Sequence, residues 1–184
     1  MVFEYILKKH GIDPTTDLTI IQNIDFGITS QSFAAGTGDY TIEFEPAATG
    51  IESQKAGKVV ASLGVESGMV PYTAYSAKTS FIKKNPEVIE KFVKALQKGM
   101  DYVNTHSPEE IAKVIEPQFK ETGLETITKI VTRYYEQDTW KDNLVFEQES
   151  FDLLQDILME AGVITEKAPY EKLVNTTYST DAAK

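Results

Sequence analysis

The chain of 184 residues has no cysteine, two histidines and a single tryptophan. The lack of thiols excludes disulfide bonds, thiolate catalysis and zinc sites ligated by cysteine. His10 and His106 lie near the predicted ends of two helices, where the helix dipole favours a polar or cationic group, so we predict capping roles for both. No HExxH-like pair is present, and we therefore predict neither a metal site nor a cofactor.

Basic residues are also few. The chain has 18 Lys and Arg against 28 Asp and Glu, which gives a net charge of -10. Binding to phosphate backbones requires clustered basic side chains, so we predict no nucleic-acid partner. No apolar run of export-signal or membrane-spanning length is visible, and the 41% hydrophobic and 25% charged content is that of an ordinary globular protein.

The motifs of common enzyme sites are missing as well. The sequence has no GxSxG nucleophile turn, no GxxxxGK[ST] phosphate loop and no GxGxxG dinucleotide motif. The glycines at 36 and 38 predict only a turn. These absences favour a binding protein over an enzyme.

The most informative segment present is Asp39 to Pro46, with the sequence DYTIEFEP. It predicts a short strand that ends in two carboxylates, a phenylalanine and a proline. Side chains at the carboxyl ends of strands in an α/β sheet converge on ligand sites, so Glu43, Phe44 and Glu45 are candidate ligand-binding residues. The alternative is structural, with Phe44 in the core, solvated glutamates and Pro46 at the first position of a helix.

The first third of the chain alternates between short apolar segments and helical segments. Strands are predicted at residues 18–22, 40–44 and 58–63, and helices at 1–11, 26–36 and 46–54. Such alternation at short spacing is typical of a parallel sheet with crossover helices. We therefore predict a small α/β lobe over residues 1–69.

The pattern changes after Gly64. Residues 70–76 alternate in character and predict a strand that links two structural halves. Residues 77–184 are mainly helical, with amphipathic helices predicted at 86–103, from Ser107 onward, at 124–135 and at 147–161.

Aromatic side chains complete the candidate site. Tyr and Trp offer a flat apolar face with a polar tip, which suits stacking on a planar small molecule. Core packing is the alternative for each aromatic residue, and it is weakest for Tyr72 and for Trp140, whose flanking sequence is polar on both sides. The predicted ligand-binding residues are Asn23, Glu43, Phe44, Glu45, Tyr72 and Trp140.

The first residues, MVFEYILKKHGI, predict a helix that begins without an N-cap residue and ends at Gly11. The amide groups of an uncapped helix start need partners, so we expect further chain to precede this helix.

Several segments, taken in order, resemble a known family. They are DYTIEFEP, then PYTAYSAKTSFIKKNPEVIEKFVKALQKGMDYV, then DTWKDN followed by a helix that ends in EAGVI. The sequence resembles the solute-binding proteins of ABC importers for nitrate, sulfonates, taurine and thiamine-pyrimidine precursors. The resemblance spans nearly all of the chain.

The resemblance implies a type II periplasmic-binding-protein fold, in which two α/β lobes joined by two crossing strands hold a ligand between them. Residues 1–69 would then be most of the second lobe, 70–76 the returning hinge strand, and 77–184 the helical C-terminal part of the first lobe. The chain would be a C-terminal part of a non-enzymatic, extracytoplasmic protein that delivers a small-molecule ligand to ABC permease subunits. The family's N-terminal half has no counterpart here.

Two alternatives remain open at this stage. The same fold occurs in the pyrimidine synthase of thiamine synthesis, which the resemblance associates with a catalytic histidine and a cysteine-rich motif; this chain has no cysteine. It also occurs as the effector-sensing domain of transcription regulators, although no helix-turn-helix or basic stretch is visible.

Overall fold

The computed structural model describes all residues, 1–184, as helices joined by irregular connections, and no strand is present. The helices are α1 (Val2–Lys9), η1 (Phe26–Ile28), α2 (Thr29–Ala34), α3 (Ala47–Ser53), α4 (Leu63–Ser67), α5 (Thr79–Lys84), α6 (Pro86–Thr105), α7 (Pro108–Ile115), η2 (Glu116–Gln118), α8 (Leu124–Glu136), α9 (Gln148–Glu160), α10 (Tyr170–Leu173) and α11 (Thr177–Ala182). None of them combines the length and hydrophobicity that crossing a bilayer requires.

The predicted helices are confirmed, and their ends follow the local signals. Helix α7 begins with a capping box, in which the Ser107 hydroxyl accepts from the Glu110 amide at 3.3 Å and the Glu110 carboxylate accepts from the Ser107 amide at 2.9 Å. Gly162, after α9, adopts a φ of +69°, a conformation that favours glycine. The short helices α4, α5, α10 and α11 were not predicted.

Both histidines follow a helix directly, as predicted. His10 is the C-terminal cap residue of α1, and its ring lies 3.3 Å from the Glu66 carboxylate. His106 follows α6, with Nδ1 2.8 Å from the Tyr102 carbonyl and its ring stacked on the Tyr102 ring. Both side chains therefore lie at the C-terminal end of a helix, where the helix dipole favours a polar or cationic group.

The four predicted strands at 18–22, 40–44, 58–63 and 70–76 are not observed. These residues form connections between helices, and Leu63 already belongs to α4. No backbone hydrogen bond joins any two of these segments. Alternating apolar residues make a strand only where a neighbouring segment exchanges backbone hydrogen bonds with it, and here none does. The predicted divisions at 69 and 77 remain predictions.

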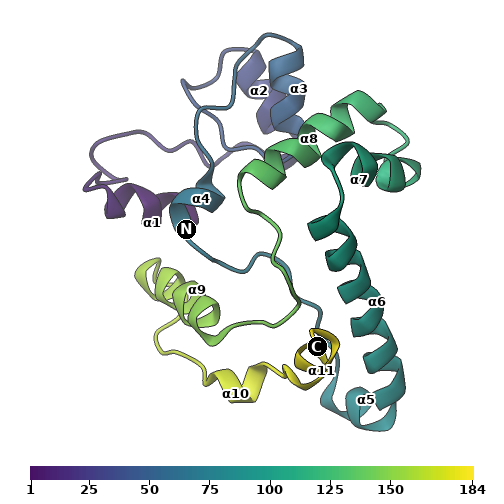
Figure 1. Ribbon diagram of the computed structural model, residues 1–184. Coiled ribbons are helices and arrows are strands. Elements are labelled where there is room, and N and C mark those ends of the chain that lie inside the picture. The colour runs from purple at the N-terminus through teal and green to yellow at the C-terminus, as the bar shows by residue number, and fades with distance from the viewer.

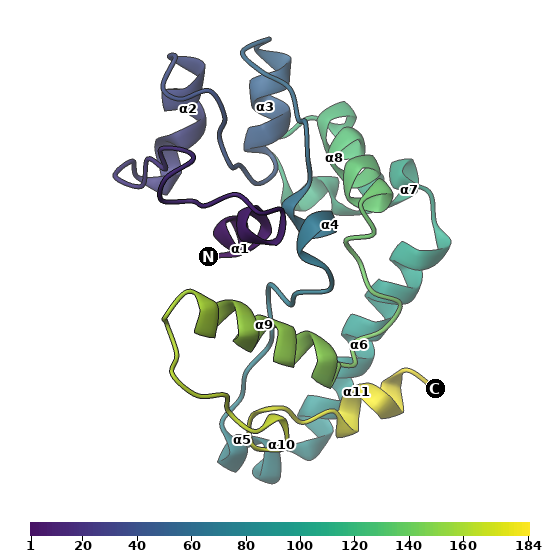
Figure 2. The same cartoon turned by 90° about the vertical axis from the view of Figure 1, so that its left-hand side faces the viewer.

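The ribbons of the helices form a ring, which the connection from α4 to α5 crosses (Figure 1). Figure 2 shows this connection from the side, running from α4 past α9 to α5. The α7 and α8 helices pack together around a core of Ile111, Ala112, Ile127 and Val131. Tyr102, Val103 and Trp140 pack against this core from outside.

The core is small for the length of the chain, since only 13 of 184 residues are buried. The accessible surface is 13005 Å². A compact monomer of this mass would expose roughly 8,900 Å². Much apolar surface is therefore uncovered, especially on the connections between helices.

Candidate functional site

Three aromatic rings gather from segments that are distant in sequence, Phe26 from η1 and the other two from connections between helices. The Phe44 ring centroid lies 5.4 Å from that of Tyr72 and 5.7 Å from that of Phe26. Phe44 is 46% exposed and Tyr72 is 82% exposed. We call Phe26, Phe44 and Tyr72 the aromatic patch; its rings lie at stacking distance from one another and are open to a ligand.

The turn after Phe44 fixes this residue at the start of α3. The Phe44 carbonyl accepts from the Ala48 amide at 3.1 Å, and the Glu45 carboxylate accepts from the Thr49 amide at 3.0 Å. A carboxylate at a helix start is stabilised by the free amides and the helix dipole. The position of Phe44 is therefore coupled to that of α3.

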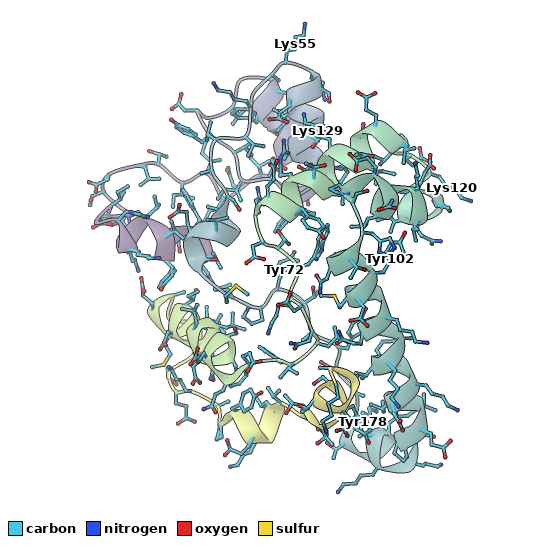
Figure 3. The ribbon with its side chains drawn as sticks, in the orientation of Figure 1. Lys55, Tyr72, Tyr102, Lys120, Lys129 and Tyr178 are labelled. Atoms are coloured by element: carbon cyan, nitrogen blue, oxygen red, sulfur yellow. The ribbon has the colours of Figure 1, made fainter.

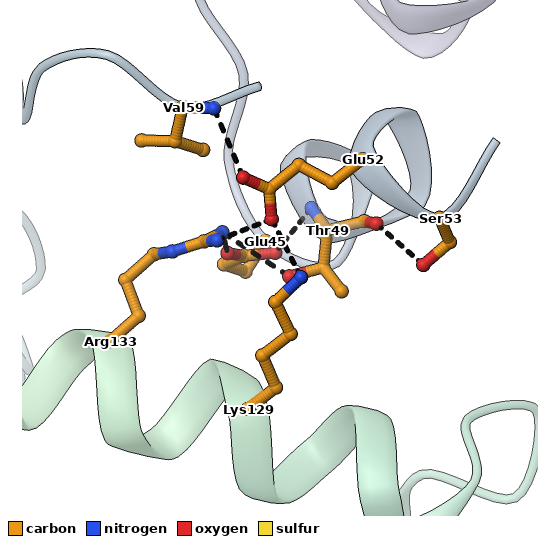
Figure 4. Close-up of polar contacts among 7 residues, drawn as sticks. All are labelled: Glu45, Thr49, Glu52, Ser53, Val59, Lys129 and Arg133. Carbon is orange, nitrogen blue, oxygen red and sulfur yellow. Dashed lines mark hydrogen bonds and ion pairs between the residues drawn. The ribbon is translucent and has the colours of Figure 1, made fainter. Parts of the chain in front are cut away.

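Glu45 also belongs to an ion-pair network between α3 and α8 (Figure 4). The Arg133 guanidinium donates to the carboxylates of Glu45 and Glu52, the latter at 2.6 Å, and Lys129 donates to Glu52 at 2.7 Å. The side chains of Arg133, Glu45 and Glu52 are only 16%, 5% and 19% exposed. We call Glu45, Glu52, Lys129 and Arg133 the clasp.

The clasp shifts the pKa values of its members. The hydrogen bond from Lys129, the amide of Val59 and the Arg133 guanidinium together lower the pKa of Glu52 from 4.5 to about 2. Burial alone would lower the pKa of Arg133, but its bonds to Glu52 and Glu45 raise it overall. Both groups are therefore held in their charged forms.

The low pKa of Glu52 predicts a pH-dependent contribution to stability. Because the folded pKa is about 2 against 4.5 for the free group, the contribution is complete above about pH 4.5 and is lost as the pH falls toward 2. We expect Glu52→Gln to lower the free energy of unfolding at pH 7, and the gap from wild type to narrow between pH 4.5 and 2. Urea unfolding across this range measures the gap. A gap that is the same at all pH values would contradict the assignment.

A cavity of about 460 Å³ lies beside Trp140. Its lining joins Met69, from the connection after α4, with the segment around Trp140 and the first turns of α9. Four carboxylates line it, from Asp138, Asp142, Glu147 and Glu149. They do not converge as metal ligands would. The only cation in the lining, Lys141, donates to the Val145 carbonyl at 2.8 Å, so the lining is acidic.

Tyr134 lies between this cavity and the aromatic patch. Its ring is 5.9 Å from that of Trp140, in an edge-to-face arrangement. Burial raises the pKa of Tyr134, and the nearby Glu45 carboxylate and Tyr72 hydroxyl act in the same direction. In Figure 3, Tyr72 lies near the middle of the molecule, below α8. Tyr134 therefore contacts Trp140 of the cavity and lies near Tyr72 of the aromatic patch.

Comparison with known proteins identifies the family. A family profile described as "NMT1/THI5 like" matches residues 1–111. The chain belongs to the NMT1/THI5-like family. A protein of Bacillus subtilis (strain 168) named "Putative binding protein YtlA" is 41% identical over 175 residues, which cover 95% of this chain and 52% of that protein. No solved structure matches.

The chain thus spans about half the length of its Bacillus relative. Membership of the NMT1/THI5-like family, together with the name of this relative, indicates a binding protein and confirms the resemblance stated from the sequence. The family implies a type II periplasmic-binding-protein fold, whose sheet is not among the elements of this structure.

The predicted site residues of this NMT1/THI5-like chain have different surroundings. The structure brings Phe44 and Tyr72 together and places Trp140 on the cavity. Glu43 accepts from the Thr41 hydroxyl at 2.8 Å, and Glu45 is engaged by Arg133. Asn23 is exposed, with no hydrogen bond or ring contact to the others. Their roles in binding remain predictions.

Sequence reasoning did not single out Arg133, Lys129 or Glu52. The only signal was spacing: Lys129 and Arg133 are four residues apart and share one face of α8, as charged residues on many solvated helices do. Their partners on α3 are 77 to 88 residues away, so the sequence does not show the pairing. Phe26 and Met69 were missed for the same reason.

Proposed function

We propose that this chain forms part of an extracytoplasmic solute-binding component that delivers a small organic nutrient to an ABC importer. The observation that carries the proposal is the exposed Phe44–Tyr72 pair, 5.4 Å apart, together with the acidic cavity at Trp140, whose indole contacts Tyr134. Exposed aromatic rings beside a concave surface with a few polar groups are typical of small-molecule sites. The name of the Bacillus relative, a putative binding protein, supports binding rather than catalysis.

The chemistry of the region favours a planar ligand that carries an amino group or a positive charge. The rings of the aromatic patch and the indole of Trp140 offer flat apolar faces. The carboxylates of the cavity accept hydrogen bonds from amino groups and repel anions. Within the ligand classes of the family, a thiamine-pyrimidine precursor fits better than taurine, a sulfonate or nitrate.

Binding would follow the two-lobe scheme. A ligand that contacts both lobes stabilises the closed form, and the permease subunits recognise that form. Residues 70–76 would act as the hinge connection, since they join residues 1–69 to the helical remainder. A protein that includes the other lobe would bind more tightly than this chain, because it would surround more of the ligand.

The lone tryptophan gives a direct test. Because Trp140 lines the cavity, ligand binding there should change its fluorescence. We expect 4-amino-5-hydroxymethyl-2-methylpyrimidine to produce a saturable change and to raise the melting temperature, whereas taurine, a simple sulfonate and nitrate produce neither. Saturable binding of the anions instead of the pyrimidine would reverse the ligand assignment, and binding of none of them would contradict the proposal.

A matched pair of tyrosine variants tests the aromatic patch. Tyr72→Ala removes a ring of the patch, and we expect affinity for the pyrimidine to fall roughly 2- to 10-fold. Tyr75→Ala is the control, because Tyr75 is similarly exposed but packs on Phe92, at 5.0 Å between ring centroids. Fluorescence titration of both variants makes the comparison. Equal affinity losses would show that the patch has no special role.

A further inference from the structure

We propose that Arg133 is a positioning residue of the binding site, which holds the Phe44 end of α3 against α8 so that the aromatic patch and Trp140 face the same space. The inference rests on the proposed function for its link to ligand affinity. The structural part of the inference, that Arg133 controls the position of α3 relative to α8, rests only on the contacts of the clasp.

The first step is the position of the clasp in the chain. Glu45 directly follows Phe44 of the aromatic patch, and Arg133 directly precedes Tyr134, which packs on Trp140. The Arg133–Glu45 ion pair therefore joins the two aromatic groups through neighbouring residues. A shift of the guanidinium relative to Glu45 would change the spacing between the two sides of the site.

The second step is the geometry, which suits arginine in particular. One guanidinium nitrogen donates to Glu45 and, at 3.2 Å, to the Thr49 hydroxyl, while the other donates to Glu52. The planar, forked guanidinium has two ends to offer, whereas a lysine ammonium is a single compact charge. The Arg133 side chain thus fixes both the distance and the orientation of α3.

The third step is that few other polar contacts join residues 1–69 to the remainder of the chain. The ion pair between Lys8 of α1 and Glu160 of α9, at 3.1 Å, is another link between residues 1–69 and the remainder, but both side chains are well exposed. Exposed ion pairs contribute little and adapt their geometry easily. In the clasp, Arg133, Glu45 and Glu52 are largely buried, and no buried side-chain polar atom lacks a partner, so the arrangement of these three residues is specific.

The fourth step separates positioning from stability. Removing one partner of a buried ion pair lowers folding stability because it leaves the other charge uncompensated, but the residues of the clasp are not part of the buried core between α7 and α8. Phe44 and Tyr72 are exposed and receive no support from the α7–α8 core. The expected result of losing the guanidinium is thus a folded protein in which α3 and its attached Phe44 move relative to α8.

The experiment uses spin labels on engineered cysteines, which the absence of native cysteine makes straightforward. Labels at Gln54→Cys, after α3, and Glu121→Cys, before α8, report the separation of the two helices; both residues are exposed. We expect a narrow distance distribution in the parent, a broad one in Arg133→Gln and an intermediate one in Arg133→Lys. Lys129→Gln is the control, because it leaves both Arg133 bonds in place, and it should remain narrow.

The ligand readout is Trp140 fluorescence with the aminopyrimidine probe. If loss of the Arg133 guanidinium leaves only about a tenth of the molecules with a correctly arranged site, the dissociation constant of Arg133→Gln for the probe rises about tenfold. Lys8→Gln, which breaks the exposed pair, should leave the affinity unchanged. If Arg133→Gln does not fold, as judged by circular dichroism, Glu45→Gln replaces it, because the neutral amide weakens the same bond without changing shape.

The outcomes separate the two proposals. If neither the parent nor any variant binds the probe but the distance distribution broadens in Arg133→Gln, the clasp orders α3 and the proposed function fails. If the probe binds the parent and binds Arg133→Gln equally well, the positioning role is overturned while the proposed function stands. A distribution that stays narrow in Arg133→Gln and Glu45→Gln overturns the positioning role whether or not the probe binds.

Discussion

Replacing Ile127 by alanine is expected to lower the free energy of unfolding by about 2–5 kcal/mol. Ile127 is only 3% exposed and belongs to the buried group of Ile111, Ala112, Ile127 and Val131 between α7 and α8. Globular domains have about 5–15 kcal/mol of stability in total, and this small core places the chain at the low end. The substitution is therefore expected to remove a large part of the free energy of unfolding.

Urea unfolding followed by circular dichroism measures this effect. Val88→Ala is the matched control, since Val88 is an exposed aliphatic residue on α6, and we expect it to change stability by less than about 0.5 kcal/mol. An Ile127→Ala protein as stable as Val88→Ala would mean that the α7–α8 core does not carry the fold.

The second large effect concerns association. We expect the 184-residue chain to self-associate in solution, with a mass of two or more chains by light scattering. Its accessible surface of 13005 Å² exceeds that of a compact monomer by roughly 4,000 Å². Obligate homodimers bury about 2,000–5,000 Å² in total, which is roughly 1,000–2,500 Å² on each chain, so pairing of two copies would cover part of this excess. The exposed aromatic and aliphatic residues of the connections supply the apolar contact.

Two of these connections give the test. Tyr40 and Val60 are 82% and 67% exposed and lie in segments without backbone partners. The double variant Tyr40→Ser, Val60→Ser should associate less than the parent at equal concentration, whereas Lys58→Ser, in the same connection as Val60, should not. A parent chain that stays monomeric and melts cooperatively at all concentrations would contradict this prediction.

The sequence predicted the helices well because their signals are local. The Ser107 cap, the proline at the start of α6 and Gly162 after α9 each act within one turn, and the structure shows all of them in place. Strands depend on a neighbour instead. Residues 70–76 alternate as a strand would, but alternation does not show which segment supplies the hydrogen bonds.

The candidate site was predictable in part for the same reason. Phe44 was chosen because it lies at a predicted strand end and Tyr72 because it lies in the predicted linking strand, and their rings do meet. Glu45 was chosen as a ligand acceptor, yet the structure shows its carboxylate bound to Arg133. One sequence does not show a pair of charges 88 residues apart, because each looks like an ordinary surface charge.

The long separation across the clasp also has a consequence for the order of folding. The α7–α8 pair needs only residues 108–136 and can form early, since closing a short loop costs little chain entropy. The bonds of Arg133 to Glu45 and Glu52 close loops of 88 and 81 residues, so they are favourable only after Arg133 has been placed on a formed α8. The aromatic patch would then acquire its final position late, when α3 docks on a helix pair that is already folded.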